Sequence, residues 1–448
     1  MRASSSIPVV PGALPLVGHL VPLLRNPLRL LSSLPSHGDL VRIGLGPVPV
    51  VVVCDPDLTE HVLRHDDVFD KGGPIFDQVR EVMSESVIGC PYSVHRRQRR
   101  LMQPAFARDR MPGYAELMEQ QITARIDSWQ DGQILDVSAE TQRLTSTVTT
   151  AALFSDTVRD VVLRQALDDI TTLVDGAFRR LLMPPPLDHL PTPGNRAFGR
   201  ARTHLRQTLD EIIAGRRDTT RHDDLLSMLL AARDTATDGR GLTDTELADQ
   251  IIGFFIAGTE TTATTLAWAL YLLDRHPEIA NRLHHEVDTV LTDRHAHYAD
   301  LPHLALTGRI ITETLRLRPP AWLLTREVTE DTDLGGHRLL AGTTVAYSAY
   351  LIHHRPDLYP DPERFDPDRW DPARPQPPRN ALIPFGHGAR KCIGDVFALT
   401  LSTLTLATLA TRWELHSLSG KSVRIARSGV LHPRSLHMRA TARRRRAG

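Results

Sequence analysis

A single cysteine near the end of the chain lies in a glycine-rich loop whose pattern is suited to binding iron. Residues 384–394 read PFGHGARKCIG, and a long apolar helix is predicted to follow over 396–411. Glycines permit a close backbone approach to a flat ligand, and loop amides together with the positive end of the helix stabilise a thiolate at Cys392. Such a thiolate is a strong axial ligand for haem iron, and Arg390 can pair with a haem propionate. The alternative is a structural cysteine buried in a turn.

This loop resembles the haem-binding loop of the cytochrome P450 family. The resemblance rests on six of its residues, which are Phe385, Gly386, Gly388, Arg390, Cys392 and Gly394. Further signatures of the family follow in the same order through most of the chain. The resemblance implies a single large, mainly α domain with a smaller β-rich portion. It also implies a monooxygenase that uses O2 and haem b, with Cys392 as the axial ligand of the iron.

The apolar helix predicted over 251–273 contains an unusual polar step at Glu260 and Thr261. A threonine hydroxyl can bond the carbonyl four residues back and open the turn. A local opening would leave room for dioxygen and water. Thr261 would then hydrogen-bond the dioxygen while Glu260 feeds protons from solvent, as a general-acid relay. Without the cysteine loop, the same residues would indicate only a buried helix with one glutamate that reaches solvent.

The pair Glu313 and Arg316 lies in a second predicted helix, three residues apart and therefore on one face. Alone, this spacing is common on ordinary solvent-exposed helices. Its order and distance relative to Cys392 match the cytochrome P450 family, and the resemblance implies that Arg364 completes a structural triad with Glu313 and Arg316. A buried group of this kind needs further hydrogen bonds to offset its desolvation.

Three further basic residues are candidate partners of the haem propionates. His95 and Arg99 are four residues apart, so they share a helix face and can reach one carboxylate together. By resemblance to the family, Arg326 grips the other propionate. For each of them, a solvated surface cation is the alternative.

We predict that the elements that position these residues form one domain over 1–448. A β-rich part is predicted at about 38–55, a helical core at about 95–320, the haem-thiolate loop at 384–394 and a disordered basic tail at about 440–448. No internal repeat or long linker divides the chain.

Composition excludes several other classes of protein. The chain has 448 residues with 53 basic and 53 acidic side chains, and this balance argues against a nucleic-acid binder. Three scattered cysteines exclude a disulfide framework and a CxxC zinc motif, and they suit a reducing compartment. No apolar stretch is long enough for a transmembrane anchor, so we expect a cytoplasmic protein.

The predicted substrate pocket is mostly apolar, which suits a neutral hydrophobic small molecule held by shape. By resemblance, its main candidates are Phe255, Ala257, Trp322 and Leu323, and further candidates are Phe76, Val87, Ile88, Leu181, Met183, Val430 and Leu431. For each of these, a place in the ordinary core is the alternative.

The segments 11–19 and 319–326 resemble actinomycete members of the family that oxidise sesquiterpene hydrocarbons of the pentalenene type in antibiotic biosynthesis. Oxidation of one methyl group to the alcohol and then the aldehyde is the expected reaction. A fatty-acid or polyketide hydroxylase is the alternative within the family, and a non-catalytic haem sensor or carrier is the alternative of another class. No fused flavin or nicotinamide module follows Cys392, so electrons from NAD(P)H are expected to arrive through a separate ferredoxin and ferredoxin reductase.

Overall fold

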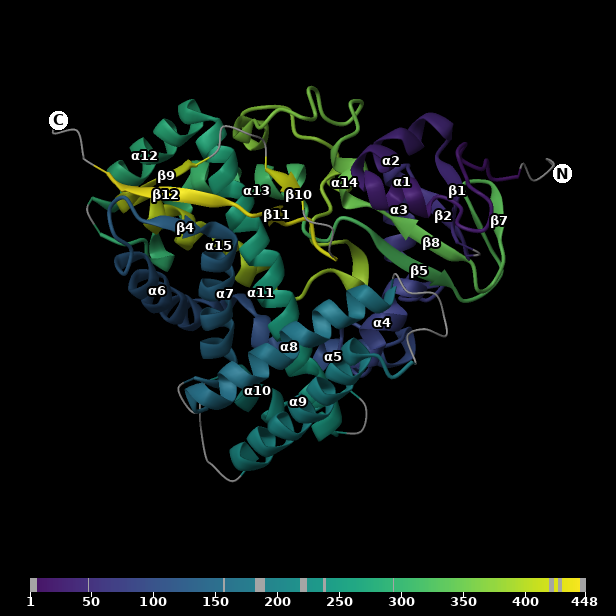
Figure 1. The fold of residues 1–448 in the computed structure, drawn as a ribbon, viewed down its shortest axis with the longest axis horizontal. Helices are drawn as coiled ribbons and strands as arrows, with labels where there is room; N and C mark the ends of the chain where they lie inside the picture. The colour runs from purple at the N-terminus through teal and green to yellow at the C-terminus, as the bar shows by residue number, and fades with distance from the viewer. Residues whose placement is uncertain are drawn as a thin grey trace.

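The computed structural model describes residues 6–46, 48–155, 158–181, 190–217, 224–236, 239–292, 294–418, 423–425 and 429–443. Figure 1 shows a small sheet with short helices at the N-terminal side and a larger helical body beside it, with the two ends of the chain on opposite sides. The predicted class, mainly α with a smaller β-rich portion, is confirmed.

Helices dominate the described chain. Those in the first half are α1 (Leu20–Arg25), α2 (Pro27–Ser33), α3 (Pro56–Arg64), α4 (Pro74–Met83), α5 (Tyr92–Met102), α6 (Met111–Asp127), α7 (Val137–Phe154), α8 (Asp160–Leu181), α9 (Pro193–Arg217) and α10 (Leu225–Ala231). Those in the second half are α11 (Asp244–Arg275), α12 (Pro277–Leu291), α13 (Ala305–Leu317), α14 (Ala349–His353) and α15 (Asp395–Arg412).

The strands of the described residues form four small sheets. The largest has the order β1-β2-β8-β5-β3, made of β1 (Leu40–Leu45), β2 (Val48–Val53), β8 (Thr344–Tyr347), β5 (Leu324–Val328) and β3 (Phe69–Asp70). A second has the order β4-β12-β9, made of β4 (Ile134–Asp136), β12 (His437–Ala442) and β9 (Trp413–Ser417). Two-stranded pairs complete the set, namely β6 (Thr332–Leu334) with β7 (His337–Leu339) and β10 (Arg424–Ile425) with β11 (Pro433–Arg434).

Strand β2 explains why the largest sheet is stable. Its β-branched residues alternate between two separate apolar clusters: Val50 and Val52 pack into one, and Val51 and Val53 into the other. All four are buried, because the sheet is covered on both faces. This sheet carries Arg326 on β5, and so it places one of the predicted propionate partners beside the helical body.

Helix α11 runs through the middle of the helical body (Figure 1). Its start is fixed by a capping box, in which the Thr243 side chain accepts from the Glu246 backbone and the Glu246 carboxylate accepts from the Thr243 backbone. Helix α7 packs along it, and the Thr145 hydroxyl donates to the backbone carbonyl of Thr259 at 3.0 Å. The two helices are therefore held by a hydrogen bond as well as by apolar contact.

The Glu313–Arg316 pair is buried on α13 and is rich in hydrogen bonds. Arg316 Nε and Nη2 donate to the two carboxylate oxygens of Glu313 at 2.9 and 2.8 Å, and Nη1 donates to the carbonyls of His353 and Pro362. Glu313 also accepts from the indole N–H of Trp370 at 2.8 Å. This network joins α13 to α14 and to the irregular segment that precedes the cysteine loop.

The third member of the predicted triad needs correction. Arg364 contributes only its backbone carbonyl, which accepts from Arg316 Nη2 at 3.1 Å, while its side chain is exposed. The next residue, Phe365, fills the core, so the Arg364 side chain turns outward. Arg369 instead brings a second guanidinium to within 3.6 Å of Glu313.

The predicted boundary of the disordered tail at 440 is too early. Residues 437–442 form β12, which pairs with both β4 and β9. Arg443 forms an ion pair with Asp288 at 2.8 Å and donates to the carbonyl of Ala410, because the strand leads it back onto the helical body. The rest of the predicted tail, 444–448, lies outside the described residues.

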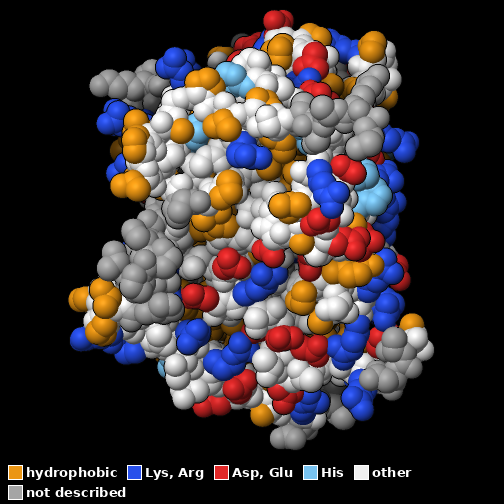
Figure 2. All heavy atoms as spheres, turned by 90° about the vertical axis from the view of Figure 1, so that its right-hand side faces the viewer, with side chains coloured by type: hydrophobic (Ala, Val, Ile, Leu, Met, Phe, Trp, Pro, Cys, Tyr) orange, Lys and Arg blue, Asp and Glu red, His pale blue; other side chains and the backbone are white. Residues whose placement is uncertain are grey.

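The surface mixes charges of both signs, as the neutral formal charge implies. On the face in Figure 2, basic and acidic side chains alternate over the lower part, and apolar side chains are more frequent above. Among the residues that the structure describes, no helix combines the length and the apolar character needed to cross a bilayer.

Replacing Arg316 with Met should strongly destabilise the fold. The change leaves the Glu313 carboxylate buried without its main partner, which costs about 3–5 kcal/mol. The free energy of unfolding from urea titration measures the effect. The control, Arg282→Met, removes a partly exposed pair with Asp368 and should cost less than about 1 kcal/mol. Equal losses in the two variants would contradict the structural role of the buried pair.

Candidate haem-thiolate site

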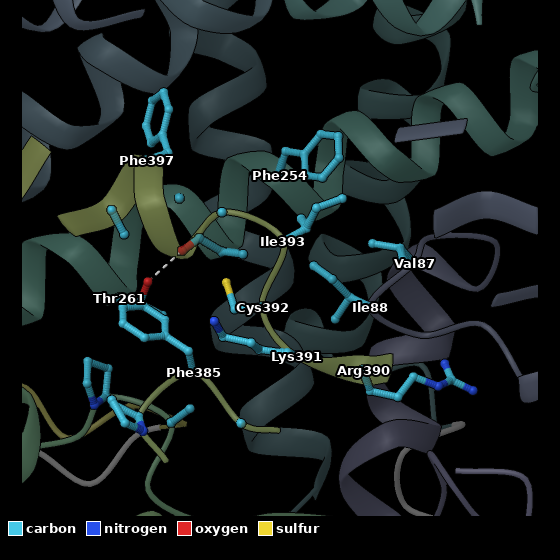
Figure 3. A pocket seen from close by; sticks show the side chains of 18 of the residues that line it. Val87, Ile88, Phe254, Thr261, Phe385, Arg390, Lys391, Cys392, Ile393 and Phe397 are labelled. Carbon is cyan, nitrogen blue, oxygen red and sulfur yellow. Dashed lines mark hydrogen bonds between the residues drawn. The ribbon is translucent and has the colours of Figure 1, made fainter. Parts of the chain in front are cut away.

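The site is a cavity of about 360 Å³ enclosed by α11, α4, the strand β5 and the loop that carries Cys392. Figure 3 shows the sulfur of Cys392 pointing into the cavity and Thr261 entering from α11. Most of the lining is apolar, including Phe254, Phe385 and Ile88. A flat apolar ligand with a metal at its centre could therefore lie between the sulfur and α11.

The loop geometry depends on two glycines with positive φ, Gly386 at +70° and Gly388 at +68°. A Cβ at Gly388 would collide with the backbone carbonyl of Leu63 at the end of α3, so only glycine fits there. The Cys392 N–H donates to the carbonyl of Phe385 at 2.9 Å and closes the loop. The sequence predicted positive φ and a close backbone approach at these glycines, but towards a flat ligand; the close approach that the structure shows at Gly388 is to the backbone of α3.

The Cys392 side chain is open to the cavity and surrounded by protein on its other sides. Burial raises the pKa of its thiol, and a backbone hydrogen bond at Gly394 acts in the opposite direction. A bound iron would supply the positive charge that a thiolate needs at this position.

A group of basic side chains lines the same cavity and lacks an anion. His95 is buried with Nδ1 unpaired, and Arg326 is buried with Nε unpaired among the described residues. Burial and then the nearby Arg390 lower the pKa of His95 to about 3. A buried unpaired donor costs roughly 1–3 kcal/mol, so the two donors favour a ligand that carries carboxylates. Haem, with its two propionates, fits this requirement.

Lys71 belongs to this group and was missed by sequence reasoning. It lines the cavity, and its Nζ donates to the carbonyl of Ile88 at 2.9 Å. Burial, followed by repulsion from Arg326 and Arg390, lowers its pKa to about 7. The one available signal was a lysine next to two glycines in a chain whose basic residues are almost all arginine.

Arg390 and Arg99 already have partners within the protein. Arg390 is buried between two carboxylates, Asp66 at 3.0 Å and Asp70 at 2.6 Å, and it also donates to the carbonyl of Cys90. Figure 3 shows it pointing away from the sulfur. Arg99 donates to the carbonyl of Lys391 at 2.5 Å. Both arginines hold the cysteine loop in place and line the cavity, and their contact with a propionate stays a prediction.

Helix α11 is continuous past Thr261, so the local opening expected from the sequence is absent from the described helix. The Thr261 hydroxyl donates to the carbonyl of Ala257 at 2.7 Å, the bond drawn in Figure 3. Thr265 repeats this one turn later by donating to the carbonyl of Thr261. Each hydroxyl shares a carbonyl with the helix without displacing its backbone hydrogen bond.

Glu260 faces a different cavity from Thr261. Thr261 lines the cavity of Cys392, whereas Glu260 lines a second cavity of about 460 Å³. Consecutive helix residues are about 100° apart around the axis, which explains the separation. Burial, and then the charge of Asp175, raises the pKa of Glu260 to about 7.

Only one of the four main substrate-pocket candidates lines the cysteine cavity, and that residue is Ala257. Phe255 lies one helical step away from the lining residue Phe254 and is part of the core. Trp322 and Leu323 pack against the sheet cluster, because their neighbours Ala321 and Leu324 take the cavity side. The prediction is therefore wrong for Phe255, Trp322 and Leu323.

The further candidates divide between the two cavities and the core. Phe76, Val87 and Ile88 line the cysteine cavity. Leu181 and Val430 line the second one. Leu431 is buried, and its carbonyl accepts from the Trp268 indole. Met183 lies outside the described residues.

The raised pKa of Glu260 predicts a pH-dependent stability difference between the native protein and Glu260→Gln. The folded state binds the proton more tightly than the unfolded chain, so the native glutamate loses stability as pH rises from about 4.5 towards 7. The glutamine variant avoids this loss, and its relative stability should rise by up to about 3 kcal/mol between pH 4 and 8. Urea unfolding across this range measures the difference. The exposed Glu116→Gln is the control, and parallel profiles for both variants would contradict the shift.

Comparisons with known proteins agree with this geometry. Residues 8–438 match the family model described as Cytochrome P450. The chain is 45% identical over 436 residues to a pentalenene oxygenase of Streptomyces avermitilis, covering 97% of each chain. It is 44% identical to a cyclooctat-9-en-7-ol 5-monooxygenase of Streptomyces melanosporofaciens, covering 92% of this chain and 90% of that one.

A solved structure shares the whole architecture. The crystal structure of the cytochrome P450DA heme domain is similar with a TM-score of 0.89, 26% identity and 99% coverage of both chains. Together with the family match and the relatives above 40% identity, this likeness settles the classification. The chain belongs to the cytochrome P450 family.

Proposed function

We propose that this cytochrome P450 monooxygenase oxidises a terpene hydrocarbon and that the Cys392 thiolate would hold the iron of its haem. The observation that carries the proposal is the position of the Cys392 thiol and the Thr261 hydroxyl in one mainly apolar cavity. The unpaired donors of His95 and Arg326 in the same cavity support the binding of the haem propionates there.

When bound, a haem with a thiolate ligand activates dioxygen for cleavage of its O–O bond. The residues of the chain position the reactants and supply protons. The hydroxyl of Thr261, which donates to the Ala257 carbonyl in this structure, would have to turn to donate its hydrogen bond above the sulfur, and Glu260, which lines the neighbouring cavity, would replace the proton as a general acid. Apolar side chains such as Phe254 and Ala257 exclude water from the C–H bond to be oxidised.

The apolar lining supports a substrate without a charged group. Apart from the basic group assigned to the propionates, the cavity is lined by side chains such as Phe76, Val87 and Leu324. One relative is named for pentalenene and another for an olefinic alcohol, cyclooctat-9-en-7-ol. We therefore infer a cyclised terpene, with a pentalenene-like sesquiterpene as the first choice and oxidation of a methyl group to the alcohol and aldehyde. A role in antibiotic biosynthesis follows from that choice.

The alternatives receive less support. A fatty acid would need a cation for its carboxylate, and the cations that line the cavity either have partners within the protein, as Arg390, Arg99 and Lys391 do, or are assigned here to the propionates. A haem carrier would have no use for the Glu260–Thr261 pair.

A ferredoxin with its reductase is the proposed electron source, and the cytoplasm is the proposed location.

Terpene hydrocarbons should change the haem absorption spectrum when they bind. Titration of the purified holoprotein with a pentalenene-type hydrocarbon should give a saturable spin-state change, and a fatty acid of similar length should not. The variant Ala257→Leu narrows the cavity and should weaken hydrocarbon binding by about tenfold, as expected for overpacking by 1–3 kcal/mol. A stronger spectral response to the fatty acid than to the hydrocarbon would instead indicate a fatty-acid hydroxylase.

Replacing Thr261 with Ala should separate electron consumption from product formation. The variant keeps its haem and its thiolate-type carbonyl spectrum, but it loses the hydroxyl that positions protons. Product formed per NAD(P)H should fall at least about tenfold while hydrogen peroxide rises, since general-acid catalysis contributes about 10²–10⁴-fold. Thr245→Ala, an exposed site on the same helix, is the control. Full coupling in the Thr261 variant would exclude its role in the relay.

A further inference from the structure

The segment 84–90, between α4 and α5, forms one wall of the cysteine cavity. Two of its side chains, Val87 and Ile88, line the cavity, and in Figure 3 both lie on the opposite side of Cys392 from Thr261. The segment consists of turns and contains no helix or strand. Its position must therefore be fixed by contacts with other elements.

Two buried polar residues of α11 bind the backbone of this segment. The Gln250 side chain accepts from the Val87 N–H at 2.9 Å and donates to the Glu85 carbonyl at 3.0 Å. The preceding residue, Asp249, accepts from the Glu85 N–H at 2.7 Å. Both side chains are fully buried, although the helix that follows them is mostly apolar. The two residues thus give an irregular segment the hydrogen bonds that a neighbouring strand would give.

This contact is joined to two further helices. Gln98 of α5 donates to the same Glu85 carbonyl, and its own carbonyl oxygen accepts from Gln250 at 3.0 Å. Arg206 of α9 forms an ion pair with Asp249. Both ends of the Gln250 amide therefore have partners within a buried network. Removal of one member of such a network leaves buried groups without partners, which is costly.

The carbonyl groups of the segment are held by cations. Lys71 donates to the carbonyl of Ile88 at 2.9 Å, and Arg80 of α4 donates to the next carbonyl at 3.2 Å. Arg390 of the cysteine loop donates to the carbonyl of Cys90 at 2.9 Å. Helix α11 thus binds the first half of the segment, and the cations bind the second half.

A glycine lets α11 lie directly against the segment. Gly253 follows Gln250 by nearly one turn, and a Cβ there would lie 3.1 Å from Ile88 Cδ1 and 3.4 Å from Ser86 Cβ. Glycine is a poor helix former, and at this position it permits the close packing. Hydrogen bonds and packing together leave the wall little freedom.

Resting on the proposed function, we propose that Gln250 is a positioning residue that fixes Val87 and Ile88 as a rigid wall, and that this wall selects fused-ring hydrocarbons over flexible chains. A wall that is ordered before binding loses little entropy when a rigid molecule packs against it. A flexible chain gains less, because it loses its own conformational freedom on binding. Gln250 is buried away from the cavity lining, so its effect passes through the segment.

Hydrogen–deuterium exchange of the holoprotein measures the anchoring without any substrate. In Gln250→Met, the peptide that covers 84–90 should exchange at least about tenfold faster, because a buried hydrogen-bond partner is worth roughly this factor in an opening equilibrium. Thr145→Val is the matched control. It removes a buried hydrogen bond to the Thr259 carbonyl of α11 and should leave the exchange of this peptide unchanged.

Selection is measured with two imidazoles that bind the haem iron through nitrogen, whatever the natural substrate is. One carries a fused-ring hydrocarbon group, and the other carries a linear alkyl group with the same number of carbons. The native protein should prefer the fused-ring probe. In Gln250→Met the affinity for this probe should fall at least about fivefold, while the affinity for the linear probe changes less than about twofold.

A second variant, Gly253→Ala, keeps the Gln250 side chain and presses on Ile88 from α11. Alanine favours the helix, so the variant should fold. It should also lower the affinity for the fused-ring probe more than that for the linear one, and it decides the question if Gln250→Met does not retain haem. Thr145→Val should keep the native ratio of the two affinities.

Unchanged exchange of the peptide in Gln250→Met would overturn the proposal. It would also fail if the native protein showed no preference for the fused-ring probe, or if the ratio of the affinities stayed constant in the variants. An equal change in Thr145→Val would reduce the effect to a general loosening of α11. Failure of every terpene to bind would reject the proposed substrate alone, because neither the exchange nor the imidazole probes depend on it.

Discussion

The site depends on a buried ion pair between the cysteine loop and the segment that follows α3. Arg390 is held by Asp66 and Asp70, and no part of its side chain is exposed. Arg390 lies two residues before Cys392, and its ion pairs fix the backbone that carries the cysteine. Gly388 lets the loop lie directly against the backbone of Leu63. Removing one partner of a buried pair costs several kcal/mol, so the position of the sulfur is strongly determined. The cavity, its basic lining and its approach to α11 all follow from that position.

Helix α11 supplies the second organising feature, because it places the two residues of the proposed relay, Glu260 and Thr261, in different cavities. Thr261 lines the cavity of the sulfur and Glu260 lines the second cavity. A carboxylate facing the iron would add charge to an apolar pocket and bring water with it. The one-residue offset around the helix keeps the Glu260 carboxyl out of the lining of the cysteine cavity.

Local sequence patterns predicted the features that depend on neighbouring residues. The cysteine loop could be recognised because its glycines and its thiol lie within eleven positions, and the mainly α class followed from helical periodicity. The spacing of Glu313 and Arg316 placed them on one helix face, but their buried structural role was implied only by the resemblance to the cytochrome P450 family. Lys71 could not, because its neighbours along the chain do not reveal that the fold brings it to His95 and Arg326.

The wrong predictions concern side-chain direction, both in segments without a fixed period and within helix α11. Arg364 turns outward next to buried Phe365, and Trp322 turns towards the sheet where Ala321 faces the cavity. A one-position error was enough to choose Phe255 over Phe254. The expected opening of α11 was also wrong for the described helix, because Thr261 bonds the Ala257 carbonyl and leaves the helix intact. Such directions are decided by tertiary packing, which a single sequence does not display.

The most direct measurement is the absorption spectrum of the reduced holoprotein under carbon monoxide. Coordination by sulfur predicts a thiolate-type carbonyl spectrum in the native protein and its loss in Cys392→Ser, while Cys90→Ser retains it. A native protein that binds no haem, or a Cys392→Ser variant that keeps the thiolate-type spectrum, would contradict the account.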